Sequence, residues 1–254
     1  MILLRGKDKV TLKGNLSRGC YMGILKGQVA LITGGSSGIG EGIAHAFARE
    51  GSDLALIARN PIRLERTASK LREQGVKVLT FSTDVRDERR IQEAVRETIS
   101  VLGGIDILVN SAGTGRYAPV AEMDLEEWEE VIETNLTGTF ICCKAVMPHM
   151  MERKRGRIIN ISSVAGKIGF ATGSAYCASK WGVIGFSRSL AVEAKPYNIR
   201  VDVICPGTVD TPFPHSPAAS KLMLEVEDVV KAVMFLLSLP ERARVEDIVM
   251  HPNV

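Results

Sequence analysis

Ser163, Tyr176 and Lys180 have the side-chain types and the spacing to exchange a proton with a substrate oxygen. Residues 174–194 have helical periodicity, and positions four apart share a helix face, so Tyr176 and Lys180 are predicted neighbours. A phenol has an ordinary pKa of about 10, and a cation within about 4–6 Å lowers an acid's pKa by roughly 1–3. We therefore predict that Lys180 lowers the pKa of Tyr176 towards that of a general acid/base, while Ser163 holds a reacting carbonyl oxygen. The Tyr-x-x-x-Lys spacing alone is more typical of an amphipathic helix with a half-buried ring.

A glycine-rich turn, Thr33-Gly-Gly-Ser-Ser-Gly-Ile-Gly40, joins a predicted strand to a predicted helix. Glycines permit close approaches that a Cβ atom prevents, and the amino end of a helix offers unpaired N–H groups to a pyrophosphate. The spacing is G-x-x-x-G-x-G rather than the usual G-x-G-x-x-G, and a tight connection without a ligand would look the same. The candidate cofactor-binding residues of this turn are Gly34, Ser36, Ser37, Gly38, Ile39 and Gly40.

The end of the second predicted strand bears on the choice of cofactor. A carboxylate there binds the ribose 2′-hydroxyl of NAD, whereas an arginine accommodates the 2′-phosphate of NADP. The sequence is Ile57-Ala-Arg-Asn60, which contains no acidic residue, and the fork of donors on Arg59 suits a phosphate. Arg59 thus favours NADP(H) over NAD(H); a solvated surface arginine is the alternative.

Seven short runs rich in β-branched residues alternate with segments of helical periodicity. The runs span residues 29–33, 54–58, 76–81, 105–109, 157–161, 199–204 and 248–250. Most are continuously apolar, which is typical of strands covered on both faces, and parallel neighbours need crossover connections. We predict an α/β fold, a single doubly wound parallel sheet of about seven strands with helices on both faces, over residues 27–254. Ligands of such sheets bind at the carboxyl ends of the strands.

Further motifs follow other predicted strands, namely Asp84-Val85, Asn110-Ser-Ala-Gly113 and Pro206-Gly207, and Asn135 lies between two of these strands. Together with the glycine turn, Ser163 and Tyr176-x-x-x-Lys180, they resemble in order and spacing the short-chain dehydrogenase/reductase family, whose members have a Rossmann fold. The resemblance implies that Tyr176 is the general acid/base and that Lys180 lowers its pKa and binds the nicotinamide ribose. It also implies that Ser163 holds the substrate oxygen and that Asn135 supports a water-linked proton relay through Lys180.

The same resemblance implies which residues contact the cofactor beyond the glycine turn. Those on the adenosine side are Asp84, Val85, Asn110, Ala112 and Gly113. Those on the nicotinamide side are Tyr176, Lys180, Pro206, Gly207, Val209 and Thr211. Asp84 and Val85 would touch the adenine. The backbone after Pro206-Gly207 would hold the carboxamide of the nicotinamide.

The sequence departs from the family's pattern at three places. Ser111 stands where the usual motif has a second asparagine, so local hydrogen bonds should differ. The segment between Thr211 and Asp228 is short and rich in proline, which favours a stiffer or more open pocket than that of relatives. The chain also ends without the glycine-rich turn common in relatives. Relatives form dimers or tetramers, so a homodimer or homotetramer is expected, with the last strand's part in a tetramer left open.

Composition excludes several classes of protein. The chain has 254 residues, 45% of them hydrophobic, and no apolar run near the roughly 18 residues that span a bilayer. Residues 1–26 carry six basic residues and one acidic residue, a net charge of +5 against +3 for the whole chain. This segment is predicted to be a poorly ordered basic extension, or sequence upstream of a start at Met22. The rest of the chain is slightly acidic, which does not favour a broad nucleic-acid-binding face. Five cysteines, two of them adjacent at 142 and 143 and none in a C-x-x-C pair, and four isolated histidines favour reduced thiols in a cytoplasmic protein without a metal site.

These features predict an NADP(H)-dependent oxidoreductase that transfers a hydride between nicotinamide and a carbonyl or secondary-alcohol substrate. The alternative is an NADPH-binding regulatory or scaffolding protein with little catalysis, and an isomerase or dehydratase on the same fold is a third possibility. Candidate substrate-lining residues are 114–117, 164–172 and Phe213. Ile168 and Phe170 favour a moderately apolar small carbonyl compound, while Arg116 either binds a substrate carboxylate or lies exposed in its loop.

Overall fold

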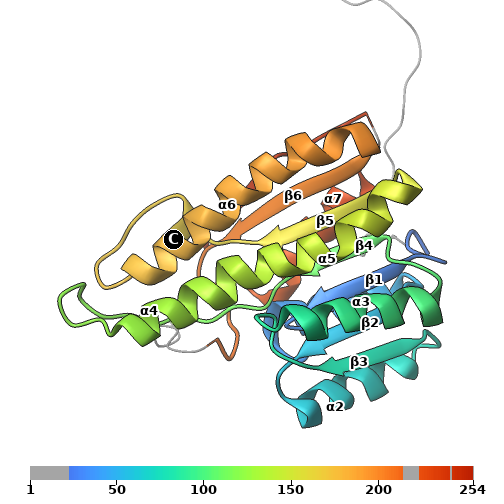
Figure 1. Ribbon diagram of the computed structural model, residues 1–254, viewed down its shortest axis with the longest axis horizontal. Helices are drawn as coiled ribbons and strands as arrows, with labels where there is room; N and C mark the ends of the chain where they lie inside the picture. Colours follow the sequence, from blue (N-terminus) through green and yellow to red (C-terminus); the bar gives the residue numbers. More distant parts are fainter. Residues whose placement is uncertain (1–22, 214–222, 241, 254) are drawn as a thin grey trace, which may run out of the picture.

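Seven parallel strands form one sheet in the order β3-β2-β1-β4-β5-β6-β7 in the computed structural model (Figure 1). The structure describes residues 23–213, 223–240 and 242–253. The strands are β1 (Val29–Thr33), β2 (Asp53–Ala58), β3 (Val78–Ser82), β4 (Ile107–Asn110), β5 (Gly156–Ile161), β6 (Ile199–Pro206) and β7 (Asp247–Met250). Every neighbouring pair is parallel, so the predicted doubly wound sheet of about seven strands is confirmed.

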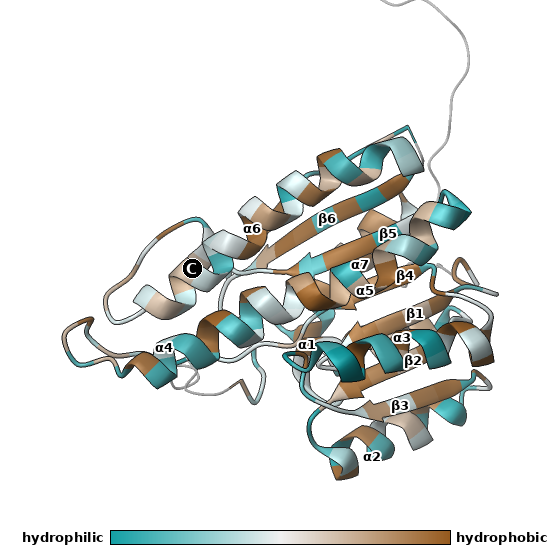
Figure 2. Ribbon diagram, in the orientation of Figure 1, coloured by the Kyte–Doolittle hydropathy of each residue, from teal (hydrophilic) through white to brown (hydrophobic). Residues whose placement is uncertain are grey.

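Helices cover both faces of this sheet. They are α1 (Gly38–Arg49), α2 (Pro61–Arg72), α3 (Glu88–Leu102), α4 (Leu125–Ile132), α5 (Gly138–Arg153), α6 (Ser174–Ala194) and α7 (Val226–Ser238). One hydrophobic core contains residues of α1, α2 and α7, and a second contains residues of α3, α5 and α6. In β1, Ile32 belongs to the first core and its neighbour Leu31 to the second, and both are fully buried. Burial on both faces explains the continuously apolar strands, which Figure 2 shows as mostly brown arrows.

The order of the strands reverses beside β1, which pairs with β2 on one side and with β4 on the other. At such a switch point ligands bind outside the carboxyl ends of the strands. Thr33 ends β1 and pairs in register with Asn110, the last residue of β4, so the motifs that follow these strands meet at one edge. Within the described ranges, no helix is both long and apolar enough to cross a membrane.

The packed region begins slightly before residue 27, which is the first residue of the domain predicted from the sequence. Leu25 is buried in the first core with 2% of its surface exposed, and the amide of Ile24 donates a hydrogen bond to Glu50. One apolar side chain at the end of a basic segment is enough to extend the core, and counts of charge do not detect it. Of residues 1–26, which were predicted to be a poorly ordered extension, residues 1–22 lie outside the described ranges.

Candidate active site

The turn between β1 and α1 has the backbone geometry that its glycines predict. Gly34 and Gly38 have positive φ angles of 68° and 53°, in the left-handed region. A Cβ atom at Gly40 would lie 2.4 Å from the carbonyl oxygen of Gly34, so no side chain fits at this crossing. Ser37 precedes α1 and makes no side-chain capping bond, so the first N–H groups of the helix remain without a side-chain cap.

Thr33 joins this glycine turn to the loop after β4. Its buried hydroxyl accepts hydrogen bonds from the amides of Ser111 and Ala112, both at 3.1 Å. The contact holds Ser111 through its backbone and does not depend on the serine side chain that departs from the family's pattern. This role of Thr33 was not predicted, and the only signal for it in the sequence is a threonine as the last residue of the strand before the glycines.

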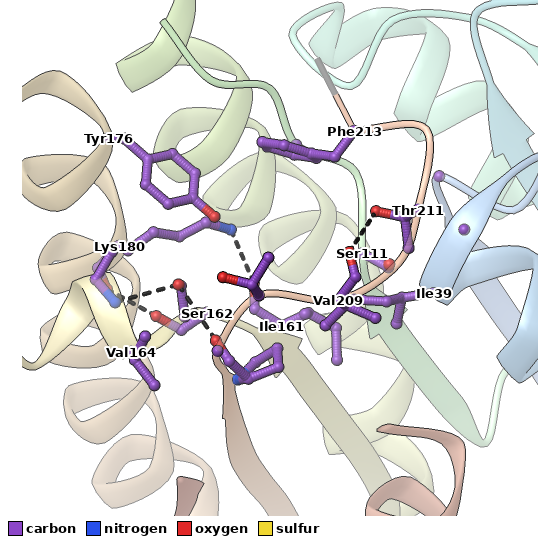
Figure 3. Close-up of a pocket in the computed structure, with 18 of the residues that line it drawn as sticks. Ile39, Ser111, Ile161, Ser162, Val164, Tyr176, Lys180, Val209, Thr211 and Phe213 are labelled. Carbon is purple, nitrogen blue, oxygen red and sulfur yellow. Dashed lines mark hydrogen bonds between the residues drawn. The ribbon is translucent and has the colours of Figure 1, made fainter. Parts of the chain in front are cut away.

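Three of the four predicted catalytic side chains, those of Ser163, Tyr176 and Lys180, meet in one cavity at the carboxyl ends of β5 and β6. Figure 3 shows Tyr176 and Lys180 in this cavity. Helix α6 has the predicted bounds, and Lys180 Nζ lies 5.6 Å from the centre of the Tyr176 ring. Lys180 Nζ also donates a hydrogen bond of 3.0 Å to the carbonyl oxygen of Ile161. The hydroxyl of Ser163 donates to the carbonyl oxygen of Pro206 at 3.3 Å.

The protonation of Tyr176 differs from the prediction. Burial raises the pKa of Tyr176 and the nearby Tyr117 adds to this effect, whereas the Ser163 hydroxyl lowers it. Burial likewise lowers the pKa of Lys180 to about 8. The predicted lowering of the Tyr176 pKa by Lys180 is therefore wrong for the protein alone, because loss of hydration is the largest influence on this pKa. At neutral pH the phenol is protonated and most Lys180 side chains are charged.

Asn135 lies in a π-helical turn, η1 (Glu133–Thr137), between α4 and α5, and such turns often mark functional positions. Its Nδ2 donates hydrogen bonds to the carbonyl oxygen of Thr114 and to the hydroxyl of Ser179, both at 2.9 Å. Its Oδ1 accepts from the amide of Thr114 at 2.8 Å. The Ser179 hydroxyl donates in turn to the carbonyl oxygen of Tyr176. Asn135 therefore fastens the loop after β4 to the helix that carries Tyr176.

The cavity has a volume of about 670 Å³ and extends from the glycine turn to the aromatic side chains of Tyr117, Phe170 and Phe213. The predicted catalytic and cofactor-binding residues that line it are Gly34, Ser37, Gly38, Ile39, Ala112, Gly113, Ser163, Tyr176, Lys180, Pro206, Gly207, Val209 and Thr211. The predicted substrate segments contribute Tyr117, Val164, Ala165, Ile168, Phe170, Thr172 and Phe213. Five lining residues were not predicted, namely Ser111, Ile161, Ser162, Thr208 and Pro212. They lie at the same strand ends as the predicted residues.

Seven predicted site residues do not line this cavity, namely Ser36, Gly40, Arg59, Asp84, Val85, Asn110 and Asn135. Arg59 is exposed just after β2. Asp84 follows β3 and accepts hydrogen bonds from the Arg86 guanidinium on both carboxylate oxygens, at 3.1 and 2.9 Å. Burial opposes this charge, but the bonds from Arg86 hold the pKa of Asp84 below its ordinary value. An adenine contact at Asp84 would therefore involve a carboxylate that already has a partner.

The remaining members of this group are buried. Ser36 is 7% exposed, Val85 is 6% exposed and packs close to Gly138, and Gly40 lies against Gly34. Asn110 is 4% exposed, and its Nδ2 donates to Asn160 Oδ1 within the sheet at 2.8 Å. These positions support the walls of the cavity from behind.

Residues 28–221 match the short chain dehydrogenase family, which is well over half of the chain. The chain belongs to this family. D-threitol dehydrogenase of Mycolicibacterium smegmatis (strain ATCC 700084 / mc(2)155) is 41% identical over 191 residues, which cover 75% of this chain and 74% of that protein. A short-chain dehydrogenase of this kind is an oxidoreductase that transfers a hydride at CH–OH or C=O groups, and its fold binds a nicotinamide cofactor.

Two solved structures resemble this short-chain dehydrogenase over nearly its whole length. An alcohol dehydrogenase from the archaeon Thermococcus sibiricus, complexed with 5-hydroxy-NADP, is 34% identical with a TM-score of 0.83 and covers 89% of this chain and 96% of that one. Carveol dehydrogenase from Mycobacterium avium, in complex with NAD, is 29% identical with a TM-score of 0.84. The match covers 90% of this chain and 97% of that one. Because the two complexes hold different cofactors, the similarity supports a nicotinamide site without selecting NADP or NAD.

The sequence left the role of Arg116 in this short-chain dehydrogenase open. Arg116 is paired with Glu130 at 2.9 Å and lies 3.8 Å from Glu127, and it does not line the cavity. Its position favours a structural loop arginine over a partner for a substrate carboxylate. Among the residues that the structure describes, no group of three His, Cys, Asp or Glu side chains could hold a metal ion.

Proposed function

We propose that this short-chain dehydrogenase uses NADP(H) to interconvert a carbonyl compound and a secondary alcohol, with Tyr176 as the general acid/base. The observation that carries the proposal is the meeting of Ser163, Tyr176 and Lys180 in one cavity with the glycine turn. A protein that only bound NADPH as a regulator or scaffold would have no need of this set. An enzyme is therefore favoured over a regulatory or scaffolding protein.

The residues around the glycine turn fit a dinucleotide. A Cβ atom at Gly38 would lie 3.2 Å from the side chain of Thr211, so glycine keeps open the passage between the turn and the loop after β6. The uncapped N–H groups at the start of α1 suit a pyrophosphate. We expect the glycine turn to hold the phosphates, Ala112 and Gly113 to lie on the adenosine side, and residues 206–211 to lie on the nicotinamide side. When bound, the nicotinamide supplies or accepts the hydride.

In the reducing direction, Ser163 and Tyr176 both donate hydrogen bonds to the substrate oxygen and stabilise the negative charge that develops there. Burial keeps the phenol of Tyr176 protonated at neutral pH, so a proton is available for that oxygen as the carbonyl carbon is reduced. The Lys180 ammonium, 5.6 Å from the ring centre, then favours the phenolate that remains. In the oxidising direction, the phenolate takes the proton back from the alcohol.

The preference for NADP(H) rests on Arg59. Its exposed side chain follows β2, and no ion pair involves it among the described residues, which leaves its guanidinium available for a 2′-phosphate. The test is consumption of NADPH and of NADH by the purified protein with a panel of ketones, aldehydes and diketones. Arg59→Glu should lower kcat/KM for NADPH by roughly 10- to 150-fold, the equivalent of one charge-assisted hydrogen bond, and should spare NADH.

Arg66→Glu is the matched control, because Arg66 is also an exposed arginine but lies on the next turn of α2. Arg66→Glu should leave kcat/KM for NADPH and for NADH unchanged. A wild type that prefers NADH, or equal losses with both cofactors in Arg59→Glu, would overturn the role of Arg59 while leaving the catalytic set in place. Absence of turnover with every compound would favour the NADPH-binding regulatory protein.

We further propose a cytoplasmic homodimer or homotetramer. Apolar rings exposed on the helices support self-association: Trp181 is 53% exposed and Phe140 is 45% exposed. Four cysteines in the described ranges are buried free thiols, which fits a reducing compartment. Light scattering after size exclusion tests the oligomer, and a monomer at assay concentration would contradict it.

A further inference from the structure

Three aromatic side chains form one side of the cavity beside Tyr176, and we name Tyr117, Phe170 and Phe213 the ring wall. The centre of the Tyr117 ring lies 5.9 Å from that of Phe170 and 5.8 Å from that of Tyr176. Phe213 lies 5.9 Å from Tyr176, and Figure 3 shows these two rings side by side. These separations are typical of favourable aromatic pairs, so the rings form a continuous apolar surface around the phenol.

Glycines in neighbouring loops make this close arrangement possible. A Cβ atom at Gly115 would lie 2.8 Å from Tyr117 Oη and 3.0 Å from the ring of Phe213. At Gly173 a Cβ atom would lie 2.4 Å from the ring of Phe170. The rings thus pack directly on the backbone of the loops, and any larger residue at these positions would displace them.

Charged groups are scarce in the cavity. Lys180 is the only charged side chain among the described residues that line it. The cations of the predicted substrate segments are paired elsewhere, Arg116 with Glu130 and Lys167 with Asp247. A carboxylate or phosphate on the substrate would therefore lose its hydration without gaining a partner.

Hydroxyl groups are few among the predicted substrate segments that line the cavity, where Tyr117 and Thr172 supply them. The other lining hydroxyls, besides Ser163, belong to the glycine turn and to the loops after β4, β5 and β6, namely Ser37, Ser111, Ser162, Thr208 and Thr211. A substrate hydroxyl packed against the rings would therefore lose water without gaining a partner there. By contrast, Ile168 and Phe170 expose 57% and 47% of their surfaces to water. An apolar ring placed against them would remove this surface from water, which is favourable.

We infer, on the basis of the proposed function, that the ring wall selects uncharged substrates whose carbonyl or secondary alcohol belongs to or adjoins an apolar ring, namely alicyclic or aryl ketones. The oxygen would lie at Ser163 and Tyr176 while the ring packs on Phe170 and Phe213. These two phenylalanines are specificity-determining residues and take no part in proton transfer. This substrate class differs from a tetritol such as the one that gives the 41% identical relative its name.

The first test compares kcat/KM for three ketones with NADPH and with NADH: 2-decalone, 4-oxocyclohexanecarboxylate and erythrulose. These represent an apolar fused ring, a single ring with a charge, and a chain with three hydroxyls. We expect 2-decalone to exceed each of the other two by at least about 100-fold, because unpaired polar groups are penalised in the cavity. Equal or higher values for either polar ketone would overturn the inference and would leave the proposed function standing.

The second test uses Phe170→Ala, with Phe235→Ala as its control. Phe235 is 46% exposed on α7 and does not line the cavity, so the two variants remove the same group from similarly exposed positions. Phe170→Ala should raise KM for 2-decalone about tenfold while kcat and the KM for acetone change little. Phe235→Ala should change none of these values. Equal losses with 2-decalone and acetone, or no loss with either, would contradict a specificity role.

Calorimetric titration of 2-decalone into the NADP⁺-saturated protein separates the inference from the proposed function. Binding that Phe170→Ala weakens about tenfold and Phe235→Ala preserves would support the ring wall even if no ketone were turned over, and the failure would then belong to the proposed function. No binding, or binding that both variants preserve, would overturn the inference whatever the turnover.

Discussion

Replacement of Asn135 by alanine removes the side chain that fastens the loop after β4 to α6. Asn135 makes two hydrogen bonds with the backbone of Thr114 and one with the hydroxyl of Ser179. Thr114 is only 2% exposed, so water cannot readily replace the lost partners of its amide and carbonyl groups. Gly113 and Tyr117 of the same loop line the cavity, so we expect lower stability together with a disturbed site.

The size of the effect follows from these contacts. Each buried polar group left unpaired costs about 1–3 kcal/mol, so the two backbone groups of Thr114 predict a loss of roughly 2–6 kcal/mol in the free energy of unfolding. In a domain of this size each kcal/mol lowers Tm by about 2–4 °C. Asn60→Ala is the matched control, because Asn60 accepts one hydrogen bond, from the amide of Arg63 at the exposed start of α2. Such a cap contributes about 0.5–2 kcal/mol.

Urea unfolding followed by circular dichroism measures both variants under the same conditions. Asn135→Ala should show the larger loss at an unchanged m value, which indicates a native state of the same compactness. A loss no greater than that of Asn60→Ala would refute the reasoning, because the buried groups of Thr114 would then have found other partners.

The remaining predictions concern Lys180 and Gly40. Because burial lowers the pKa of Lys180 from 10.5 to about 8, the unfolded chain binds more protons between these values, so wild-type stability should rise over this pH window relative to Lys180→Met. Urea unfolding across the window measures this, and a constant difference would argue against a buried ammonium. Gly40→Ala places a Cβ atom 2.4 Å from the carbonyl oxygen of Gly34 and should cost about 1–3 kcal/mol and weaken NADPH binding by calorimetry. Gly185→Ala, which has open space within α6, should stabilise by up to about 1 kcal/mol, and equal effects of the two alanines would contradict the tight turn.

Much of the fold and the site follows from local patterns in the sequence. Tyr176 and Lys180 share a helix face because they are four residues apart, and Ser163 meets them because parallel strands end at one edge of the sheet. The glycines of the first turn likewise indicate its geometry, since Gly34 and Gly38 adopt the positive φ angles that they permit. These inferences need only the period of each element and the direction of the strands.

Contacts between distant segments were not predictable in the same way. The bonds from Asn135 to Thr114 depend on a π-helical turn, and the apolar periodicity of α4 and α5 gives no sign of it. Phe213 reaches Tyr176 through the path of the loop after β6. The pKa of Tyr176 depends on how completely the surrounding elements exclude water, and the spacing to Lys180 carries no information about that.

The central claim, that Tyr176 exchanges the proton with the substrate, is tested most directly by Tyr176→Phe. This change removes the phenolic hydroxyl and keeps the ring that contacts Tyr117 and Phe213. Tyr197→Phe, at a tyrosine in the short turn after α6, is the control. The account predicts that kcat of Tyr176→Phe falls by about 100- to 10,000-fold while calorimetry shows NADPH binding nearly unchanged, and that Tyr197→Phe keeps both. A Tyr176→Phe protein that binds NADPH and retains wild-type kcat would contradict it.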